Sequence, residues 1–343
     1  MKCSEKSSTI PWKQKYNLRA YMNALLEVKN MSVRFPLSGS DILAVRDVSF
    51  TLHKGRTLGF VGESGCGKSV TAYAILRLVP PPGKIDSGRI LYKGRDIIPL
   101  EDDEMRKIRG KEIAMIFQEP MTSLNPVFTV GYQIMESIVL HMGMNKREAR
   151  DHAADLLARV GIPDPAKRLN AYPHELSGGM RQRAMIAMAL STSPSILIAD
   201  EPTTALDVTI QAQILDLLMK LQEERQMSLL LITHDLGVVA NIADEIAIMY
   251  AGEIVEYGRT ADIFRKPGHP YTRGLFRAIP RIGENRKKLR TIRGMVPTMT
   301  SSPTGCVFFP RCDIGIEKCT MAPVALASYR YKRAVRCIRY EGE

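Results

Sequence analysis

Short apolar runs alternate with turn-forming stretches in the first part of the chain. Between residues 26 and 60, runs rich in β-forming residues are separated by turn stretches at residues 37–41 and 53–56. This spacing predicts short antiparallel strands. The last apolar run, residues 57–61, leads directly into a glycine-rich stretch. The pattern therefore predicts an antiparallel β layer that ends at a strand-to-turn junction.

The later periodicity predicts helices and then a parallel sheet. Residues 145–161 form a charged amphipathic pattern that ends at Gly161, and residues 184–190 are apolar at helical spacing. Both patterns predict helices within a helix-rich region, residues 100–190. From residue 195 to 247 strand and helix patterns alternate, which is typical of a parallel α/β core. The predicted fold class is α/β.

The glycine-rich stretch reads G-E-S-G-C-G-K-S at residues 62–69. Backbone N–H groups of such a loop surround nucleotide phosphates, while Lys68 supplies a positive charge and the Ser69 hydroxyl can bind magnesium. The alternative is a strand-to-helix turn that binds nothing. We expect the phosphates to be held by Gly62, Ser64, Gly65, Cys66, Gly67, Lys68, Ser69 and Val70.

Two carboxylates follow the apolar run at residues 195–199. A buried parallel strand would deliver Asp200 and Glu201 to the carboxyl edge of the sheet. There Asp200 could bind magnesium, and Glu201 could orient or deprotonate a water that attacks the γ-phosphate. The alternative is that these acids cap the next helix. A second anion site is predicted at residues 176–183, where L-S-G-G-M-R-Q-R opens a helix.

These motifs together resemble the ATPase subunit of an ABC transporter. A-L-D at residues 205–207 and T-H-D at residues 233–235 complete the set in that family's order and spacing, and the resemblance covers about residues 26–343. It implies a P-loop ABC ATPase with a RecA-like parallel sheet, an antiparallel β layer and a helical subdomain at about residues 119–190. The expected divisions are a basic tail (1–25), the ATPase domain (26–270) and a small C-terminal extension (271–343).

The resemblance also implies roles for individual residues. Two such subunits pack head to tail, so that ATP held by one chain is covered by Ser177, Gly178 and Gly179 of the other. Gln118 matches a glutamine that senses magnesium and water near the docked membrane subunit, and His234 matches a histidine that contacts the γ-phosphate. The implied catalytic residues are thus Glu201, His234 and Gln118. Asp207 joins the nucleotide site, and Phe35 is expected either to stack on adenine or to fill the core.

Composition limits the class of protein. The 343 residues, 45% hydrophobic, suffice for one large core and an added module. We expect no membrane span and no secretory signal, because no apolar run is long enough and the first residues are polar. Residues 1–25 and 281–343 carry net charges of +4 and +8, which together equal the formal +12 of the chain. Because few aromatic residues interleave with this charge, proximity to anionic lipid is favoured over nucleic acid, which we expect not to be a partner.

The segment that follows residue 258 narrows the transport class. H-P-Y-T-R at residues 269–273, and the form of the segment at residues 118–126, resemble ATPases of the peptide and nickel import family, in the dipeptide/oligopeptide D-type form. This resemblance implies a peripheral location at the cytoplasmic face of the membrane. It also implies a second, different ATPase subunit, two integral membrane permeases and an extracytoplasmic substrate-binding protein. ATP and Mg²⁺ are the expected cofactors, and peptide and nickel remain alternative ligands.

Four cysteines crowd the end of the chain: Cys306, Cys312, Cys319 and Cys337. Reduced thiols in a cytoplasmic protein favour a metal over disulfides, although the spacing lacks the close pairs of common zinc folds. Similar D-type subunits carry a four-cysteine motif associated with a [4Fe-4S] cluster, which is the leading expectation; Zn²⁺ is second, and four unligated cysteines are the third alternative. A soluble ABC-type ATPase that acts on nucleic acid or ribosomes, and a subunit that binds ATP without hydrolysis, are the rival functions.

Overall fold

An antiparallel sheet forms the first layer of the computed structural model, which describes residues 24–37, 39–119, 123–204, 207–278, 292–300, 303–329 and 333–340. The strands lie in the order β2-β1-β4-β5 and confirm the predicted layer. Their bounds are β1 (Ala24–Phe35), β2 (Ile42–His53), β4 (Lys84–Tyr92) and β5 (Arg95–Asp96). Strand β1 begins within the last residues of the expected N-terminal tail, because Ala24 pairs with His53. Most of that tail lies outside the described residues.

The second sheet has the described strand order β11-β12-β10-β9-β3-β8-β7-β6. Its centre is parallel, and strands β3, β6, β7, β8 and β9 are buried along their whole length. Continuous apolar runs suit strands that are covered on both faces, so the predicted parallel α/β core is confirmed. The bounds are β3 (Thr57–Val61), β6 (Ile113–Ile116), β7 (Ile196–Asp200), β8 (Ser228–Thr233), β9 (Glu245–Tyr250), β10 (Glu253–Arg259), β11 (Ala327–Tyr329) and β12 (Arg333–Val335).

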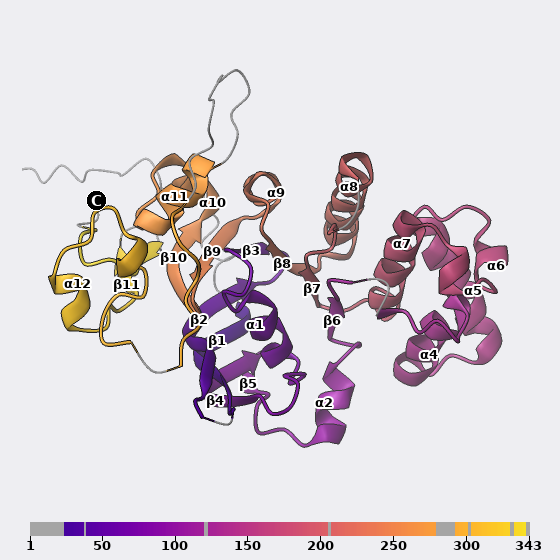
Figure 1. The fold of residues 1–343 in the computed structure, drawn as a ribbon. Coiled ribbons are helices and arrows are strands. Elements are labelled where there is room, and N and C mark those ends of the chain that lie inside the picture. The colour runs from indigo at the N-terminus through magenta and orange to yellow at the C-terminus, as the bar shows by residue number, and fades with distance from the viewer. Residues whose placement is uncertain are drawn as a thin grey trace, which may run out of the picture.

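Helix α1 packs between the two sheets, and its alanine and isoleucine side chains join both in one buried cluster (Figure 1). Other helices connect the parallel strands or follow them. Their bounds are α1 (Lys68–Ile75), α2 (Asp102–Ile108), α8 (Val208–Arg225), α9 (Leu236–Ile242), α10 (Thr260–Arg265) and α11 (Pro270–Ala278).

A separate group of helices lies beyond the edge strand β6 (Figure 1). Its members are α4 (Val130–Met142), α5 (Lys146–Arg159), α6 (Pro165–Arg168), the 3₁₀ turn η3 (Pro173–Glu175) and α7 (Gly178–Ala189). Helix α5 begins in a capping box formed by Asn145 and Glu148, and Gly161 follows its end with φ 76°, as the predicted helix requires. These helices share a buried cluster with strands β6–β8 and α8. The group occupies the predicted helical subdomain, whose limits at about 119 and 190 stay a prediction.

The C-terminal part extends the central sheet. Strand β12 pairs with β10, and β11 pairs with β12. The short turns η4 (Phe309–Arg311) and α12 (Lys318–Met321) precede these strands. Val307 and Phe308 join the buried cluster of β9, β10 and α11. The described residues of the extension therefore share a sheet and a buried cluster with the residues before it. The expected division between the ATPase domain and this extension, at residues 270 and 271, stays a prediction.

A buried carboxylate joins this extension to the sheet. Glu256 on β10 is fully buried and accepts hydrogen bonds from the backbone N–H groups of Gly268 and His269, both at 2.8 Å. The Arg333 guanidinium on β12 pairs with the same carboxylate. Burying a carboxylate is favourable only when its oxygens are bonded in this way.

Removal of this carboxylate should destabilise the protein. Glu256→Ala leaves Arg333 and two N–H groups without their acceptor, and loss of one partner of a buried pair costs about 3–5 kcal/mol. The expected result is a clear fall in the denaturant midpoint, followed by circular dichroism. The control Glu104→Ala removes a surface pair with Arg95 and should cost at most about 1 kcal/mol. Equal effects in both variants would contradict this account.

Candidate functional site

The loop between β3 and α1 holds its shape because two of its glycines admit no side chain. A Cβ on Gly62 would lie 2.3 Å from the Met249 carbonyl oxygen. Gly67 has φ 102°, and a Cβ there would lie 2.5 Å from the Ala44 carbonyl oxygen. Contacts this short do not occur between real atoms, so the sequence needs glycine at both places.

Lys68 turns its ammonium group back into this loop. Its side chain is buried, and Nζ donates hydrogen bonds to the carbonyl oxygens of Gly62 at 2.9 Å and Glu63 at 3.1 Å. Cys66 belongs to the same loop and its side chain is fully buried. Burial raises the pKa of its thiol, so this side chain is a neutral packing group. Ser64 and Gly65 are exposed at the tip of the loop, and Ser69 and Val70 are half-buried in the first turn of α1. The arrangement suits phosphates bound by backbone N–H groups and one ammonium.

Asp200 ends strand β7 as a fully buried acid. Neither carboxylate oxygen has a hydrogen-bond partner among the described residues. Burial raises the pKa of Asp200; Glu201 adds to this rise, whereas Ser69 and Lys68 oppose it. An unpartnered buried carboxylate beside a hydroxyl fits a magnesium ion, which binds through one or two carboxylates. Ser69 and Asp200 would hold such an ion.

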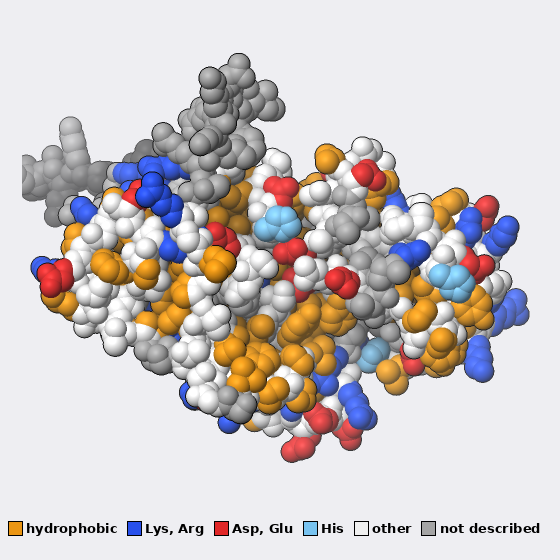
Figure 2. All heavy atoms as spheres, viewed as in Figure 1, with side chains coloured by type: hydrophobic (Ala, Val, Ile, Leu, Met, Phe, Trp, Pro, Cys, Tyr) orange, Lys and Arg blue, Asp and Glu red, His pale blue; other side chains and the backbone are white. Residues whose placement is uncertain are grey.

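Glu201 collects three partners on one oxygen. Its Oε2 accepts hydrogen bonds from Thr204 Oγ1 at 2.9 Å and Gln118 Nε2 at 3.4 Å. His234 Nδ1 lies 3.3 Å from the same atom. Glu201 has φ 45°, a conformation that is strained for a non-glycine residue. Figure 2 shows a histidine and acidic side chains together over the region where Figure 1 draws β8 and α9. The structure thus brings the three expected catalytic side chains to one point.

The second anion motif lies elsewhere in the chain. Ser177 begins α7, and its side chain accepts a hydrogen bond from the Met180 N–H at 3.3 Å. Ser177 and Gly178 are exposed, Gly179 is half-buried, and Figure 1 draws α7 well apart from α1. The motif therefore lies at the surface, apart from the loop between β3 and α1.

Two further expected residues have structural contacts. Asp207 begins α8, and its side chain accepts a hydrogen bond from the Ile210 N–H at 3.0 Å; Ala205 and Leu206 of the same motif lie outside the described residues. Phe35 is the last residue of β1 and packs, half-buried, against the buried cluster that joins the two sheets. A Cβ on Gly83 would lie 2.5 Å from its ring. Adenine stacking by Phe35 stays a prediction.

The four C-terminal cysteines line a single narrow cavity of about 10 Å³. Cys306 and Cys319 also share a hydrogen bond, from the N–H of the first to the carbonyl of the second, at 2.7 Å. Burial raises the pKa of the Cys306 thiol to about 11. Among the described residues, no three His, Cys, Asp or Glu side chains already lie close enough to bind a metal ion. The four cysteines line one cavity, but their side chains are not grouped closely enough to hold a metal ion.

Sequence reasoning missed three residues of this region. Thr204 bonds to Glu201, and Tyr271 and Arg311, from the C-terminal part of the chain, bond to Glu63 in the loop between β3 and α1. The H-P-Y-T-R stretch drew attention to Tyr271 as part of a resemblance, but no pattern linked it or Arg311 to the loop. Only the folded chain joins positions more than 200 residues apart.

Comparison with known proteins agrees with this geometry. Residues 45–204 match the family model described as "ABC transporter", and residues 255–319 match "Oligopeptide/dipeptide transporter, C-terminal region". A dipeptide transport ATP-binding protein of Bacillus subtilis is 54% identical over 299 residues, covering 87% of this chain and 89% of that protein. A putative peptide import ATP-binding protein of Brucella melitensis is 51% identical, covering 92% and 97%.

Solved structures give the same result for the fold. The ATP-binding cassette MJ0796, described as dimeric and bound to ADP and Pi, aligns with a TM-score of 0.62 at 30% identity, covering 68% of this chain and 98% of that one. The protein cbiO1 from Clostridium perfringens aligns with a TM-score of 0.60 at 25% identity, covering 71% and 92%.

The buried Asp200 should cost stability when no metal is bound. Because burial raises its pKa in the folded protein, ionisation opposes folding above the ordinary pKa of an aspartate, about 3.9, and the cost disappears as the pH falls. In chelator, Asp200→Asn should therefore have a higher melting temperature than the original chain at pH 8, and a smaller difference at pH 5. The exposed pair residue Asp103 provides the control, Asp103→Asn. A destabilised Asp200→Asn at pH 8 would contradict the account.

Proposed function

Since the chain belongs to the family of ABC transporter ATP-binding subunits, we propose that it hydrolyses ATP to power the import of dipeptides or oligopeptides. The observation that carries the proposal is the convergence of Gln118, His234 and Thr204 on the Glu201 carboxylate. Peptide as the cargo is supported by the printed names of the relatives and by the match over residues 255–319.

The proposed reaction uses groups already in place. Lys68 exchanges its bonds with the loop carbonyls for phosphate oxygens, and backbone N–H groups of residues 62–69 hold the remaining charge. Magnesium, when bound, neutralises charge that develops on the phosphates. Glu201 accepts a proton from the attacking water, while His234 and Gln118 orient the γ-phosphate and that water.

We propose that the working unit contains two ATPase chains. The exposure of Ser177 and Gly178 and the distance between α7 and α1 support a role of Ser177, Gly178 and Gly179 in covering ATP that a partner chain binds. A helix that begins with free N–H groups suits a γ-phosphate. The partner in the proposal is a second, different ATPase subunit, and ATP binding would close the pair.

The proposed complex also includes two membrane permeases and an extracytoplasmic substrate-binding protein. A cavity of about 460 Å³ beside Gln118 is lined by Tyr73, Phe117, Gln118, Glu119 and Ser123, and it suits a helix of a permease that docks at the cytoplasmic face. Figure 2 shows hydrophobic side chains near α1, next to this region. Within the part of the chain that the structure describes, no helix has the length and apolar character needed to cross a bilayer.

We further propose that the four C-terminal cysteines bind a metal centre, a [4Fe-4S] cluster first and Zn²⁺ second. Their donor chemistry suits either group, and all four line the same cavity. That cavity of about 10 Å³ holds about one water molecule, so either group requires the thiols to rearrange. Nickel as cargo, and a soluble ATPase acting on nucleic acid or ribosomes, are the alternatives, and neither has a specific observation in its favour.

Replacement of the proposed base tests the reaction. Glu201→Gln in the complete transporter should lower the ATPase kcat at least about 100-fold, because general-base catalysis contributes 10²–10⁴-fold, and should still bind ATP. The control Glu223→Gln makes the same change on the exposed side of α8 and should leave turnover unchanged. Normal turnover in Glu201→Gln would refute the assignment. Stimulation of ATPase activity by a peptide-loaded binding protein tests the cargo.

Metal content tests the cysteine proposal. The transporter purified without oxygen should contain iron and sulfide and should absorb visible light broadly. Cys306→Ser should lose the iron, the sulfide and the absorption, and the control Cys3→Ser should keep all three. Zinc in place of iron would establish the second choice. Absence of any stoichiometric metal would reject the proposal and would leave the ATPase assignment unaffected.

A further inference from the structure

The C-terminal part of the chain grips the phosphate-binding loop at Glu63. Arg311 makes a two-pronged pair with this carboxylate, with Nη1 at 2.6 Å from Oε2 and Nη2 at 3.0 Å from Oε1. The backbone N–H of Glu63 donates to the hydroxyl oxygen of Tyr271 on α11 at 2.9 Å. Both the side chain and the backbone of one loop residue are therefore held by groups from beyond residue 255.

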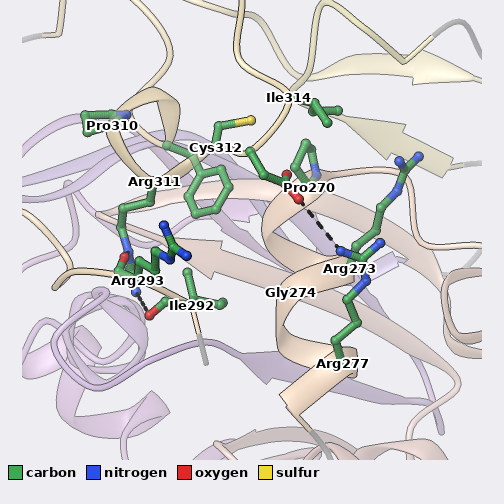
Figure 3. Close-up of a pocket in the computed structure, with 12 residues that line it drawn as sticks. Pro270, Arg273, Gly274, Arg277, Ile292, Arg293, Pro310, Arg311, Cys312 and Ile314 are labelled. Carbon is green, nitrogen blue, oxygen red and sulfur yellow. Dashed lines mark hydrogen bonds and ion pairs between the residues drawn. The ribbon is translucent and has the colours of Figure 1, made fainter. Parts of the chain in front are cut away.

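Arg311 is itself held in one orientation. Its side chain is only 6% exposed, and its Nε donates to the Arg293 carbonyl oxygen at 2.7 Å (Figure 3). Nη2 also donates to the Gly294 carbonyl oxygen at 3.2 Å, and the guanidinium lies 5.6 Å from the centre of the Tyr250 ring. Because each nitrogen of the planar Arg311 guanidinium has an acceptor, the group fixes the orientation of its carboxylate partner as well as supplying charge. The pair with Glu63 raises the pKa of Arg311, so the charge is permanent.

Glu63 lies directly against the groups that hold Lys68. The ammonium of Lys68 bonds to the carbonyl oxygens of Gly62 and Glu63. Any shift of the Glu63 backbone therefore moves one of these acceptors and changes the direction of the N–H groups that would face phosphate. A displacement of about 1 Å in a binding loop is enough to reduce activity strongly.

The same arginine lies beside the cysteine cavity. Cys312 follows Arg311 in the chain, and Pro270, Phe308, Cys312 and Ile314 line both the cysteine cavity and the larger cavity of about 610 Å³ that Arg311 borders. Figure 3 shows Cys312 and Arg311 on the same short turn. Arg311 alone therefore separates Cys312 from Glu63 of the phosphate-binding loop.

We propose that Arg311 is a positioning residue for the ATP reaction, and that it links the state of the C-terminal cysteine segment to the phosphate-binding loop through Glu63. Arg311 does not touch ATP. It sets the position of the loop that does. The proposal rests on the ATPase activity of the family and is independent of which cargo is carried or which metal the cysteines bind.

The test compares ATP kinetics of the complete transporter. Arg311→Gln and Glu63→Gln should each raise the KM for ATP about tenfold and change kcat little, because contacts of this loop hold ATP in the ground state and in the transition state alike. The double variant should be no worse than either single change. Arg311→Lys should have a KM for ATP between those of the original chain and Arg311→Gln, since lysine keeps the charge but loses the two-point pairing of the guanidinium.

The matched control is Arg277→Gln. Arg277 borders the same cavity, but it is exposed and makes only a long ion pair with Asp313, at 3.7 Å, among the described residues, so the KM of this variant for ATP should be unchanged. If Arg311→Gln does not assemble, Glu63→Gln breaks the same pair from the loop side, where Glu63 is 30% exposed. An unchanged KM in Glu63→Gln, or additive effects in the double variant, would overturn the proposal. Basal ATPase activity suffices for this test, so failure of peptide stimulation would count against the cargo alone.

Discussion

Parallel pairing of three strands is the constraint on which the rest of the structure depends. Strand β8 lies between β3 and β7, with Val61 opposite Thr233 and Asp200 opposite Ile232. Parallel strands end at the same edge of a sheet, so the loops that follow them must meet there. The phosphate-binding loop, the two acids and His234 are the residues that come next in the chain. Their convergence follows from strand order, and it would be lost if any one strand ran in the opposite direction.

This strand arrangement leaves one buried acid, Asp200, without a hydrogen-bond partner among the described residues. Strand β7 ends at Asp200, whose carboxylate oxygens have no hydrogen-bond partner in the part of the chain that the structure describes, whereas Glu256 on the same sheet has three donors. Both are fully buried carboxylates. The satisfied one supports the fold, and the unsatisfied one is suited to a cation. Contrast between two identical chemical groups is thus a guide to which of them belongs to a site.

The C-terminal segment has two kinds of contact with the ATPase core. Strand β12 extends the central sheet through backbone hydrogen bonds with β10, which are insensitive to side-chain identity. Arg311 and Tyr271 instead act on one residue of the phosphate-binding loop. The sheet contact places the described strands of the segment in the central sheet. The side-chain contacts join the same segment to the loop that precedes α1, a connection that a segment attached only by a linker would lack.

The sequence by itself predicted the glycine-rich loop, the acids at the end of β7, the α/β fold and the family, because each depends on neighbouring residues in the chain: glycines before Lys68, or an apolar run before Asp200. Tertiary structure alone decided the rest. Three contacts join positions between 77 and 248 residues apart: Gln118 with Glu201, Arg333 with Glu256, and Arg311 with Glu63. Such pairs leave no local periodicity, since their chemistry depends on strand order and on the path of the connecting chain.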